Sequence, residues 1–267
     1  MKISIVTVTY NCESTIEETI LSIINQSYQN IEYIIIDGNS KDKTLSIIQQ
    51  YETKISKIIN EPDKGIFDAM NKSLNYITGD YVIFINAGDR LVNNHIIADI
   101  FEGKNYTEDL IYGDTYIHNQ LGFQFFRGDD IYSKNPTKSQ LTLDSQGFCH
   151  QSLFTKVSIL QKIRFNLSYP LGADYDTTAK IFYTGNHKIR YIGLPISIFD
   201  DRFGGASHNQ IKRVLDERIQ MFSPNKNIFF WIKYYKLIYQ EKLKSILKII
   251  CPNQVKKIQE KKYQKKI

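Results

Sequence analysis

The residues best placed to do chemistry follow a short apolar run in the first third of the chain. In the segment YVIFINAGD, residues 81–89, five apolar or aromatic residues precede Asn86, Ala87, Gly88 and Asp89. A bounded run of this kind predicts a strand buried on both faces, and Ala and Gly after it allow a tight turn beside a ligand. A carboxylate at that strand end suits Mg²⁺ or Mn²⁺ bridging a diphosphate. The alternative is an ordinary turn in which Asp89 caps the next helix.

Two further predicted strands also end in polar residues. Thr9 and Tyr10 follow a β-branched run at 2–8, and Asp37 follows a second run at 31–36. In open α/β sheets, ligands lie beyond the carboxyl ends of the strands. We therefore expect Thr9, Tyr10 and Asp37 to lie on the same edge as the 81–89 corner.

The elements that must position these residues alternate between strand and helix. Helical periodicity follows each of the first three strands, the third of which is a short run at 55–59. The predicted helices span about 15–26, 42–50 and 66–77. Right-handed connections between such units predict an α/β fold with a mostly parallel central sheet and helices on both faces. Neither a G-x-G-x-x-G nor a Walker-type phosphate loop is present, which disfavours a dinucleotide-binding Rossmann domain.

The second half of the chain has a different pattern. Two runs around the Asn119-Gln120 turn predict an antiparallel hairpin, and a long polar loop follows. The predicted elements are strands at 110–118, 122–127, 147–154, 188–192 and 196–199, and helices at 157–163, 173–183 and about 210–221. A glycine-bearing loop at 200–209 precedes the last of these helices.

Charge and composition limit the function classes. The chain of 267 residues carries a net charge of +6, but residues 226–267 alone carry +10, so the remainder is mildly acidic. Lysines confined to a tail argue against a nucleic-acid groove across the main domain. Three distant cysteines give neither a disulfide framework nor metal-ligand spacing, and the first residues become polar too early for a signal peptide. We therefore expect a cytoplasmic protein.

The basic tail has the pattern of an interfacial helix. Between residues 227 and 250, Lys233, Lys236, Gln240, Lys244 and Lys248 recur at three- or four-residue steps, and large apolar residues fill most other positions. Such a helix lies in the plane of a membrane, and anionic lipids add roughly 1 kcal/mol per nearby lysine. The alternative is a helix packed on the main domain with a solvated lysine face.

Four segments, in this order, resemble glycosyltransferase family two. They are SIVTVTYN, DGNSKDKT, EPDKGIFDAMNK and INAGD, and the resemblance covers roughly residues 2–210. The family consists of inverting, metal-dependent nucleotide-sugar enzymes of the GT-A fold. The most similar branch is the bacterial one that assembles capsule, O-antigen and exopolysaccharide. The resemblance implies a GT-A domain at 1–222, with a nucleotide-binding half at 1–95 and an acceptor-binding half at 96–222, and a membrane-associating tail at 223–267.

The resemblance also implies a donor site. Thr9, Tyr10 and Asp37 would hold the base and ribose of the donor, with uridine as the expected base, and Asp63 would lie in the loop over the donor sugar. Asn86 would contact the diphosphate or ribose, and Asp89 would hold Mn²⁺ or Mg²⁺. The family's pair of acids after the second strand is reduced here to Asp37-Gly38, and its two or three metal-side acids are reduced to the last residue of NAGD.

The remaining candidates concern the acceptor side. Asp174, at the start of a predicted helix, matches the family's general base, although it is also a plausible helix cap; Asp176 is the second candidate. His150 and Gln151 are expected to contact the acceptor, and a late histidine, His208, to complete the metal shell. The alternatives are that His150 is a strand histidine whose hydrogen bonds are made within the protein, and that His208 is an ordinary loop residue.

Asn71 is the last donor-binding candidate. It shares a helix face with Asp68, three residues earlier, and such a pair forms either a donor contact or a solvent-exposed polar face.

These patterns predict an inverting glycosyltransferase that uses a nucleotide-diphosphate sugar and a lipid-linked or glycan acceptor. Two other classes were considered. The acid-poor NAGD corner also fits a non-catalytic sugar-nucleotide or lipid-binding scaffold. A nucleotidyltransferase is disfavoured, because it would need a glycine- and lysine-rich loop after the first strand, which residues 11–15 do not supply.

Overall fold

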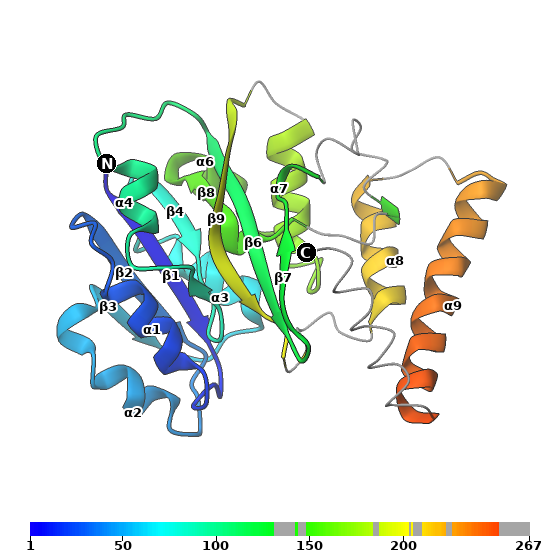
Figure 1. Cartoon of the computed structure of the whole chain (residues 1–267), viewed down its shortest axis with the longest axis horizontal. Helices are drawn as coiled ribbons and strands as arrows, with labels where there is room; N and C mark the ends of the chain where they lie inside the picture. The colour runs from blue at the N-terminus through cyan, green and yellow to red at the C-terminus, as the bar shows by residue number, and fades with distance from the viewer. Residues whose placement is uncertain are drawn as a thin grey trace.

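The chain folds around one continuous sheet. The computed structural model describes residues 1–130, 142–143, 148–183, 187–202, 204, 210–222 and 226–250, without the side chains of residues 241 and 244–250. The nine strands are ordered β3-β2-β1-β4-β8-β6-β9-β5, and β7 pairs with β6. Figure 1 shows β1–β4 on the left, the long strands β6 and β9 in the centre, and α8 and α9 on the right.

The strands are β1 Ile3–Thr9, β2 Ile31–Asp37, β3 Lys57–Asn60, β4 Tyr81–Phe84, β5 Arg90–Leu91, β6 Leu110–Asn119, β7 Gly122–Phe126, β8 Leu153–Lys156 and β9 Ile189–Asp200. The α-helices are α1 Ile16–Ile24, α2 Thr44–Gln49, α3 Ile66–Ser73, α4 Ile96–Phe101, α6 Val157–Ile163, α7 Ala173–Tyr183, α8 Ile211–Phe222 and α9 Ile228–Ile250, with 3₁₀ helices η1 Glu52–Lys54 and η3 His150–Ser152.

Alternation along the buried strands divides the core into two layers. Ile3 and Ile5 of β1 pack with the apolar faces of α1, α2 and α4, whereas Val6 and Val8 pack with α3 and α6 on the other side. Successive side chains of a strand point to opposite faces, so a continuous apolar run is what a sheet covered on both faces requires. The predicted α/β sheet with helices on both faces is confirmed.

The direction of the strands follows from the pairing. β1 pairs in parallel with β2 and β4, and β2 with β3. β8 runs antiparallel to both β4 and β6, so β6 has the same direction as β4, and β9 is parallel to β6. The carboxyl ends of these six parallel strands therefore lie at one edge, and the start of β8 lies there too.

The predicted hairpin is confirmed, because β6 and β7 pair antiparallel with His118 opposite Phe123. Two predicted strands at 188–192 and 196–199 are instead one strand, β9. Its register with β6 shifts on either side of Asp114, near Gly193 in a left-handed conformation, so the break in the sequence pattern is a bulge within one strand.

Two other boundaries differ from the prediction. The strand expected at 147–154 begins only at Leu153, because residues 150–152 form a 3₁₀ helix; the side chains of His150 and Gln151 both point into the same site, which consecutive strand residues could not do. The helix expected at 66–77 ends at Ser73. Most of the predicted polar loop at 129–145 lies outside the described residues.

The end of the described chain forms a separate small core. Leu215 of α8 and Tyr234 of α9 are buried together with Leu143, and Phe230, Trp231, Leu237 and Ile238 pack against them. The Tyr234 hydroxyl donates a hydrogen bond to Asp216 at 2.5 Å. Within the described ranges, no helix has the length and hydrophobicity needed to span a bilayer.

Candidate active site

The candidate site lies at the edge where the parallel strands end. Thr9 is opposite Asp37 in the β1–β2 register, and the backbone bond from Ala87 N to Val8 O, 3.2 Å, brings the corner after β4 beside them. The expected meeting of the three polar strand ends is therefore what the topology produces. η3 and the first turn of α7 lie at the same corner, because His150 contacts both Asn86 and Asp174.

Two oxygens at this edge are buried without a hydrogen bond. Among the described residues, neither Thr9 Oγ1 nor Asn86 Oδ1 has a partner. Buried polar atoms are almost always paired, since leaving one unpaired costs about 1–3 kcal/mol. Two such atoms on neighbouring strand ends mark a place where a polar ligand would improve the hydrogen bonding.

Tyr10, Asp37 and Asp63 meet around Gly38. A Cβ built at Gly38 would lie 2.5 Å from Asp63 Oδ2 and 3.3 Å from Tyr10 Cδ2, so glycine lets both side chains approach the backbone here. The buried Asp37 carboxylate accepts hydrogen bonds from the Ser40 amide at 2.9 Å and the Ser40 hydroxyl at 2.5 Å, whereas the Tyr10 ring is exposed. The three predicted donor residues thus form one corner, with an open aromatic face and a carboxylate fixed by its own turn.

The Asn71 side chain links two elements of the protein. Its amide nitrogen donates to Phe165 O at 2.8 Å, and its amide oxygen accepts from Phe165 N at 2.9 Å. Both ends of the side chain are used to attach α3 to the segment after α6. The structure assigns Asn71 this link between elements, and its contact with the donor stays a prediction.

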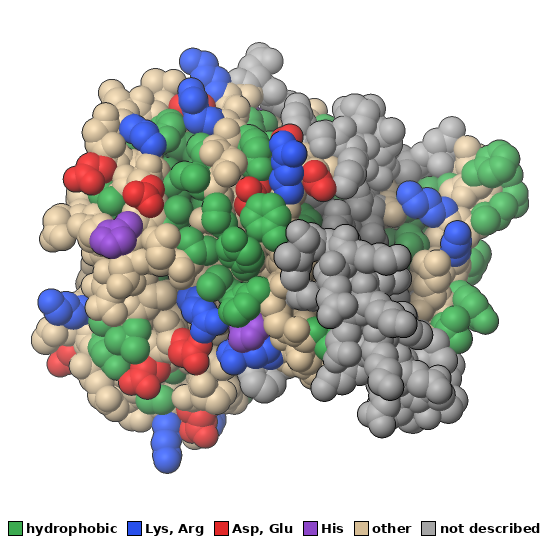
Figure 2. All heavy atoms as spheres, in the orientation of Figure 1, with side chains coloured by type: hydrophobic (Ala, Val, Ile, Leu, Met, Phe, Trp, Pro, Cys, Tyr) green, Lys and Arg blue, Asp and Glu red, His purple; other side chains and the backbone are tan. Residues whose placement is uncertain are grey.

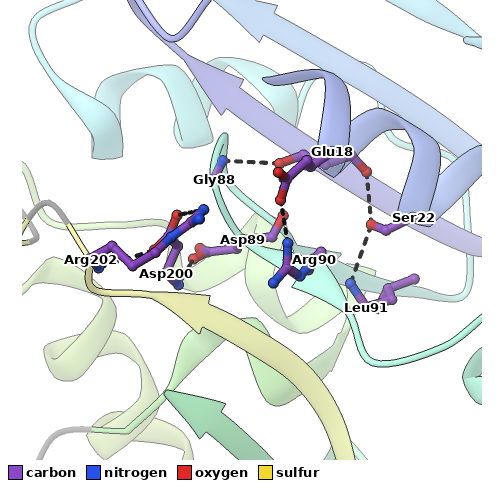
Figure 3. Close-up of polar contacts among 9 residues, drawn as sticks. Glu18, Ser22, Gly88, Asp89, Arg90, Leu91, Asp200 and Arg202 are labelled. Atoms are coloured by element: carbon purple, nitrogen blue, oxygen red, sulfur yellow. Dashed lines mark hydrogen bonds and ion pairs between the residues drawn. The ribbon is translucent and has the colours of Figure 1, made fainter. Parts of the chain in front are cut away.

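Asp89 points into the protein. Its Oδ1 accepts from the Asp200 amide at 2.9 Å and its Oδ2 from the Gln151 side chain at 3.0 Å, and the residue is 4% exposed. Burial raises the pKa of Asp89 to about 6, despite these hydrogen bonds. Figure 3 shows Asp89 directed from the β4–β5 corner toward Asp200, with Arg202 against Asp200.

Further bonds make this corner rigid. Thr19 of α1 donates from its hydroxyl to Asp89 O at 2.7 Å and accepts from Gly88 N at 3.0 Å. Arg90 forms an ion pair with Glu18, also drawn in Figure 3. Gly88 has a φ of 102°, a conformation that favours glycine. The corner is therefore held from both α1 and β9.

The described residues fit a divalent cation only in part. No three His, Cys, Asp or Glu side chains within the described ranges form a metal-binding group, and His208 lies outside those ranges. Each Asp89 oxygen accepts one hydrogen bond and keeps a second lone pair. Asn86 Oδ1 has no hydrogen-bond partner among the described residues, and Mg²⁺ or Mn²⁺ commonly takes one or two protein oxygens and completes its shell with phosphate and water.

Asp174 is the more accessible of the two carboxylates in the first turn of α7. Its Oδ2 accepts from His150 Nδ1 at 2.9 Å and its Oδ1 from the Tyr175 amide at 2.8 Å, and its side chain is 19% exposed. Asp176, by contrast, is buried and bound to Lys180 at 2.6 Å. Of the two candidates for the base, the geometry therefore favours Asp174.

His150 and Gln151 are both engaged by the protein. His150 Nε2 lies 3.0 Å from Asn86 Nδ2, while Nδ1 faces Asp174. Burial lowers the pKa of His150, but the hydrogen bond and charge of Asp174 outweigh it, so the net pKa is raised. With Gln151 Nε2 on Asp89, three polar atoms of these two side chains are bound within the protein, and the acceptor contacts of His150 and Gln151 stay a prediction.

Asp200 and Arg202 also belong to this site, although the sequence did not single them out. Arg202 makes a two-point contact with the Asp200 carboxylate, at 2.9 and 2.7 Å. Burial raises the pKa of Asp200, but Arg202 more than compensates and the net pKa is lowered. An available signal was that Asp200 ends an aliphatic strand just as Asp37 does.

With this geometry established, comparison with known proteins identifies the family. The sequence model described as "Glycosyl transferase family 2" matches residues 4–164. The chain belongs to glycosyl transferase family 2. Its similarity extends further in a "PGL/p-HBAD biosynthesis glycosyltransferase" of Mycobacterium bovis, which is 27% identical over 224 residues, covering 82% of this chain and 84% of that protein.

Solved structures place the family 2 chain in the GT-A fold. TarS 1–349 of S. aureus, solved in complex with UDP-GlcNAc, has a TM-score of 0.61 at 18% identity and covers 97% of this chain and 79% of its own. A mannosyltransferase from Pyrobaculum calidifontis, solved with GDP-Man and Mn²⁺, has a TM-score of 0.59 at 16% identity, with 90% and 68% covered. The predicted GT-A fold is confirmed.

Proposed function

We propose that this family 2 protein is an inverting hexosyl- or N-acetylhexosaminyltransferase that uses a nucleotide-diphosphate sugar, preferentially a UDP-sugar. The observation that carries the proposal is the convergence of unpaired donor-side oxygens and an accessible carboxylate at one sheet edge. Solved structures of the same fold in complex with UDP-GlcNAc, or with GDP-Man and Mn²⁺, support the donor class.

On the donor side, the base and ribose would occupy the corner of Tyr10, Asp37 and Asp63. The exposed Tyr10 ring offers a stacking surface, and the fixed Asp37 carboxylate offers a hydrogen-bond acceptor to the base or ribose. Thr9 Oγ1 and Asn86 Oδ1 have no hydrogen-bond partner among the described residues, so the donor would supply one to each. A divalent cation, when bound, would neutralise charge on the leaving diphosphate; Asp89 would hold it, and the unpaired Asn86 Oδ1 would contact the diphosphate or ribose.

On the acceptor side, Asp174 would act as the general base. In a single displacement, the acceptor oxygen bonds to the anomeric carbon, the bond from that carbon to the diphosphate oxygen breaks, and the acceptor proton passes to Asp174. A carboxylate within hydrogen-bond reach of the attacking hydroxyl typically contributes about 10²–10⁴-fold to the rate. The nucleoside diphosphate leaves from the opposite face, so the anomeric configuration inverts.

The proposed acceptor is a lipid-linked glycan in bacterial surface-polysaccharide assembly, and α9 supports it. Ile228, Ile232, Tyr235, Tyr239 and Leu243 are exposed at spacings of four, three, four and four residues, so they form one stripe on the helix. The opposite side of α9 packs on α8. The sequence offered two alternatives for this segment, a helix packed on the domain and a helix lying in a membrane interface. Because α9 has one packed and one exposed apolar side, the two are compatible.

Lysines accompany the stripe. Lys233, Lys236 and Lys242 lie on the exposed part of α9, and Figure 2 shows hydrophobic and basic side chains together at this end of the molecule. Apolar rings and aliphatic side chains bordered by lysines match an anionic membrane interface. We place the enzyme on the cytoplasmic face of the cell membrane, with the stripe in the lipid.

The test is a donor panel. UDP-glucose, UDP-galactose, UDP-GlcNAc and GDP-mannose are added with Mn²⁺, Mg²⁺ or EDTA, and thermal stabilisation and acceptor-dependent nucleotide release are measured. We expect metal-dependent stabilisation by a UDP-sugar and its turnover with a short polyprenyl diphosphate sugar. Stabilisation without turnover would favour the scaffold function suggested by the acid-poor NAGD corner, and the absence of both would contradict the proposal.

A further inference from the structure

One short turn connects the two sides of the candidate site. In η3, His150 reaches Asn86 through Nε2 at 3.0 Å and Asp174 through Nδ1 at 2.9 Å. The next residue, Gln151, binds Asp89 at 3.0 Å. The two consecutive side chains thus contact the corner after β4, and the His150 ring also contacts the first turn of α7.

We propose that His150 is a positioning residue that holds the Asp174 carboxylate in a fixed relation to Asn86. The proposal rests on the proposed function of Asp174 as the base. Nδ1 of His150 is the hydrogen-bond donor to Asp174 Oδ2, while the Tyr175 amide donates to Oδ1. The ring is a rigid spacer, so its two contacts set the distance from the base to the donor side.

The reason for such a spacer is the sensitivity of displacement reactions to alignment. A misplacement of about 1 Å can cost about 10²-fold in rate. Asp174 lies on the helix α7 and Asn86 follows the strand β4, so the separation of Asp174 from Asn86 depends on contacts between elements. His150 supplies such a contact directly, because one ring nitrogen bonds Asn86 and the other bonds Asp174.

The chain offers a matched control. His187 Nδ1 contacts Asp109 Oδ2 at 3.1 Å, with side-chain exposures of 23% and 20%, against 19% and 19% for His150 and Asp174. Asp109 and His187 precede the amino ends of β6 and β9, so this second pair lies at the opposite edge of the sheet. A purely structural His–Asp contact should respond to substitution as His187 does.

Two substitutions separate the contacts of His150. In His150→Asn, the amide nitrogen takes the place of Nδ1 and can still donate to Asp174. In His150→Gln, the amide group reaches the place of Nε2 and its oxygen can accept from Asn86 Nδ2, so the contact with Asn86 can remain while the contact with Asp174 is lost. We expect His150→Gln to lower acceptor-dependent transfer by about 10–10²-fold, His150→Asn to stay within about tenfold of wild type and above His150→Gln, and His187→Gln to be unchanged.

The decisive comparison is the double variant His150→Gln/Asp174→Asn, assayed with a UDP-sugar and a short polyprenyl diphosphate sugar. If His150 acts through Asp174, the double variant is no slower than Asp174→Asn alone, because residues acting as a unit are not additive. Independent losses that multiply, or equal losses in His150→Asn and His150→Gln, would overturn the proposal. Full transfer by Asp174→Asn would instead overturn the proposed base itself.

A measurement without substrate accompanies the kinetics. Side-chain ¹H–¹⁵N spectra of the five histidines, with His150 assigned from its variant, should show a protected Nδ1–H that shifts in Asp174→Asn. The His187 signal should stay in place. An unprotonated Nδ1 in folded His150 would contradict the proposed hydrogen bond even if the variants proved unstable.

Discussion

Unpaired oxygens at Thr9 and Asn86 are the residue-scale features that most directly indicate a ligand. Neighbouring polar side chains are satisfied: Thr7, two residues before Thr9 on β1, binds the Tyr33 hydroxyl at 3.0 Å and Ile85 O at 2.7 Å. The contrast within one strand shows that the fold can pair a buried threonine hydroxyl. The Thr9 hydroxyl, by contrast, has no hydrogen-bond partner among the described residues, which is the pattern expected where a ligand supplies the missing bond.

The pair of threonines gives a prediction. Thr9→Val removes an unpaired hydroxyl, so the free energy of unfolding should stay level or rise by up to about 1 kcal/mol, whereas Thr7→Val should lower it by about 1–3 kcal/mol. Donor affinity should fall about 2–12-fold in Thr9→Val, the value of one neutral hydrogen bond. Urea unfolding and calorimetric titration with UDP check both quantities; a destabilised Thr9→Val with normal UDP affinity would contradict the account.

Glu32 gives a second prediction, about pH rather than activity. Burial raises the pKa of Glu32, but hydrogen bonds from Lys2, Thr78 and Ser4 outweigh it and lower the pKa from 4.5 to about 2. Because the folded-state pKa lies below the unfolded one, this stabilisation is present above about pH 4.5 and is lost as pH falls toward 2.

The variant that measures this effect is Glu32→Gln. At pH 7 its free energy of unfolding should be about 1–3 kcal/mol lower than that of wild type, and the difference should shrink steadily between pH 5 and pH 3. Chemical denaturation at several pH values checks it, and a difference that is constant or grows on acidification would disagree with the prediction. Donor binding should not change, since the contacts with Lys2 and Thr78 lie at the amino ends of β1 and β4.

Residue types at the strand ends could be predicted from the sequence, but side-chain direction could not. Thr9, Asp37 and Asn86 follow apolar runs that fix their place along the chain. The orientation of Asp89 depends on Asp200, 111 residues later, and the use of Asn71 depends on Phe165, 94 residues later. Contacts of such separation leave no periodic signal in a single sequence.

At the scale of elements, the parallel half was predictable because each strand and helix carries its own periodicity. The second half was less so. The bulge in β9 breaks an aliphatic run that pairs continuously in space, and the 3₁₀ turn at 150–152 resembles a strand because its residues are as buried as those of β8. Tertiary contacts, rather than local preference, decide the conformation at both places.

The helix α9 is the element whose two faces carry different interactions. Phe230, Trp231 and Tyr234 pack toward α8, whereas Ile232, Tyr235 and Tyr239 are exposed. Large aromatic and aliphatic side chains in such a stripe are unusual on a surface that meets only water. The sequence showed the polar and apolar positions of this helix but not which apolar residues the domain would cover.

A charge placed on that stripe provides the element-scale prediction. Ile232→Glu should reduce sedimentation with vesicles containing anionic lipid by about tenfold, because it removes buried apolar area and adds a repelled charge. Gln240→Glu adds the same charge to an exposed position off the stripe and should cost at most about fivefold. Equal loss of vesicle binding in both variants would show that α9 contributes only its net charge. No loss in either variant would show that α9 does not contact the membrane.

At the scale of the whole molecule, the sheet brings separate halves of the chain to one edge. Six strands of common direction end there, and β8 starts there. The proposed donor side consists of residues before 90, and the proposed base Asp174 lies on α7. Activity therefore depends on the assembled sheet, and α9 lies at the far end of the molecule from β1–β4 (Figure 1).

The measurement that tests the central claim most directly is acceptor-dependent sugar transfer by wild type and Asp174→Asn at saturating donor and metal. The account predicts that the substitution lowers the transfer rate by about 10²–10⁴-fold, while thermal stabilisation by the nucleotide sugar stays within a degree of wild type. A folded Asp174→Asn protein that transfers sugar at the wild-type rate would show that the base lies elsewhere and would contradict the assignment of this edge as the catalytic centre.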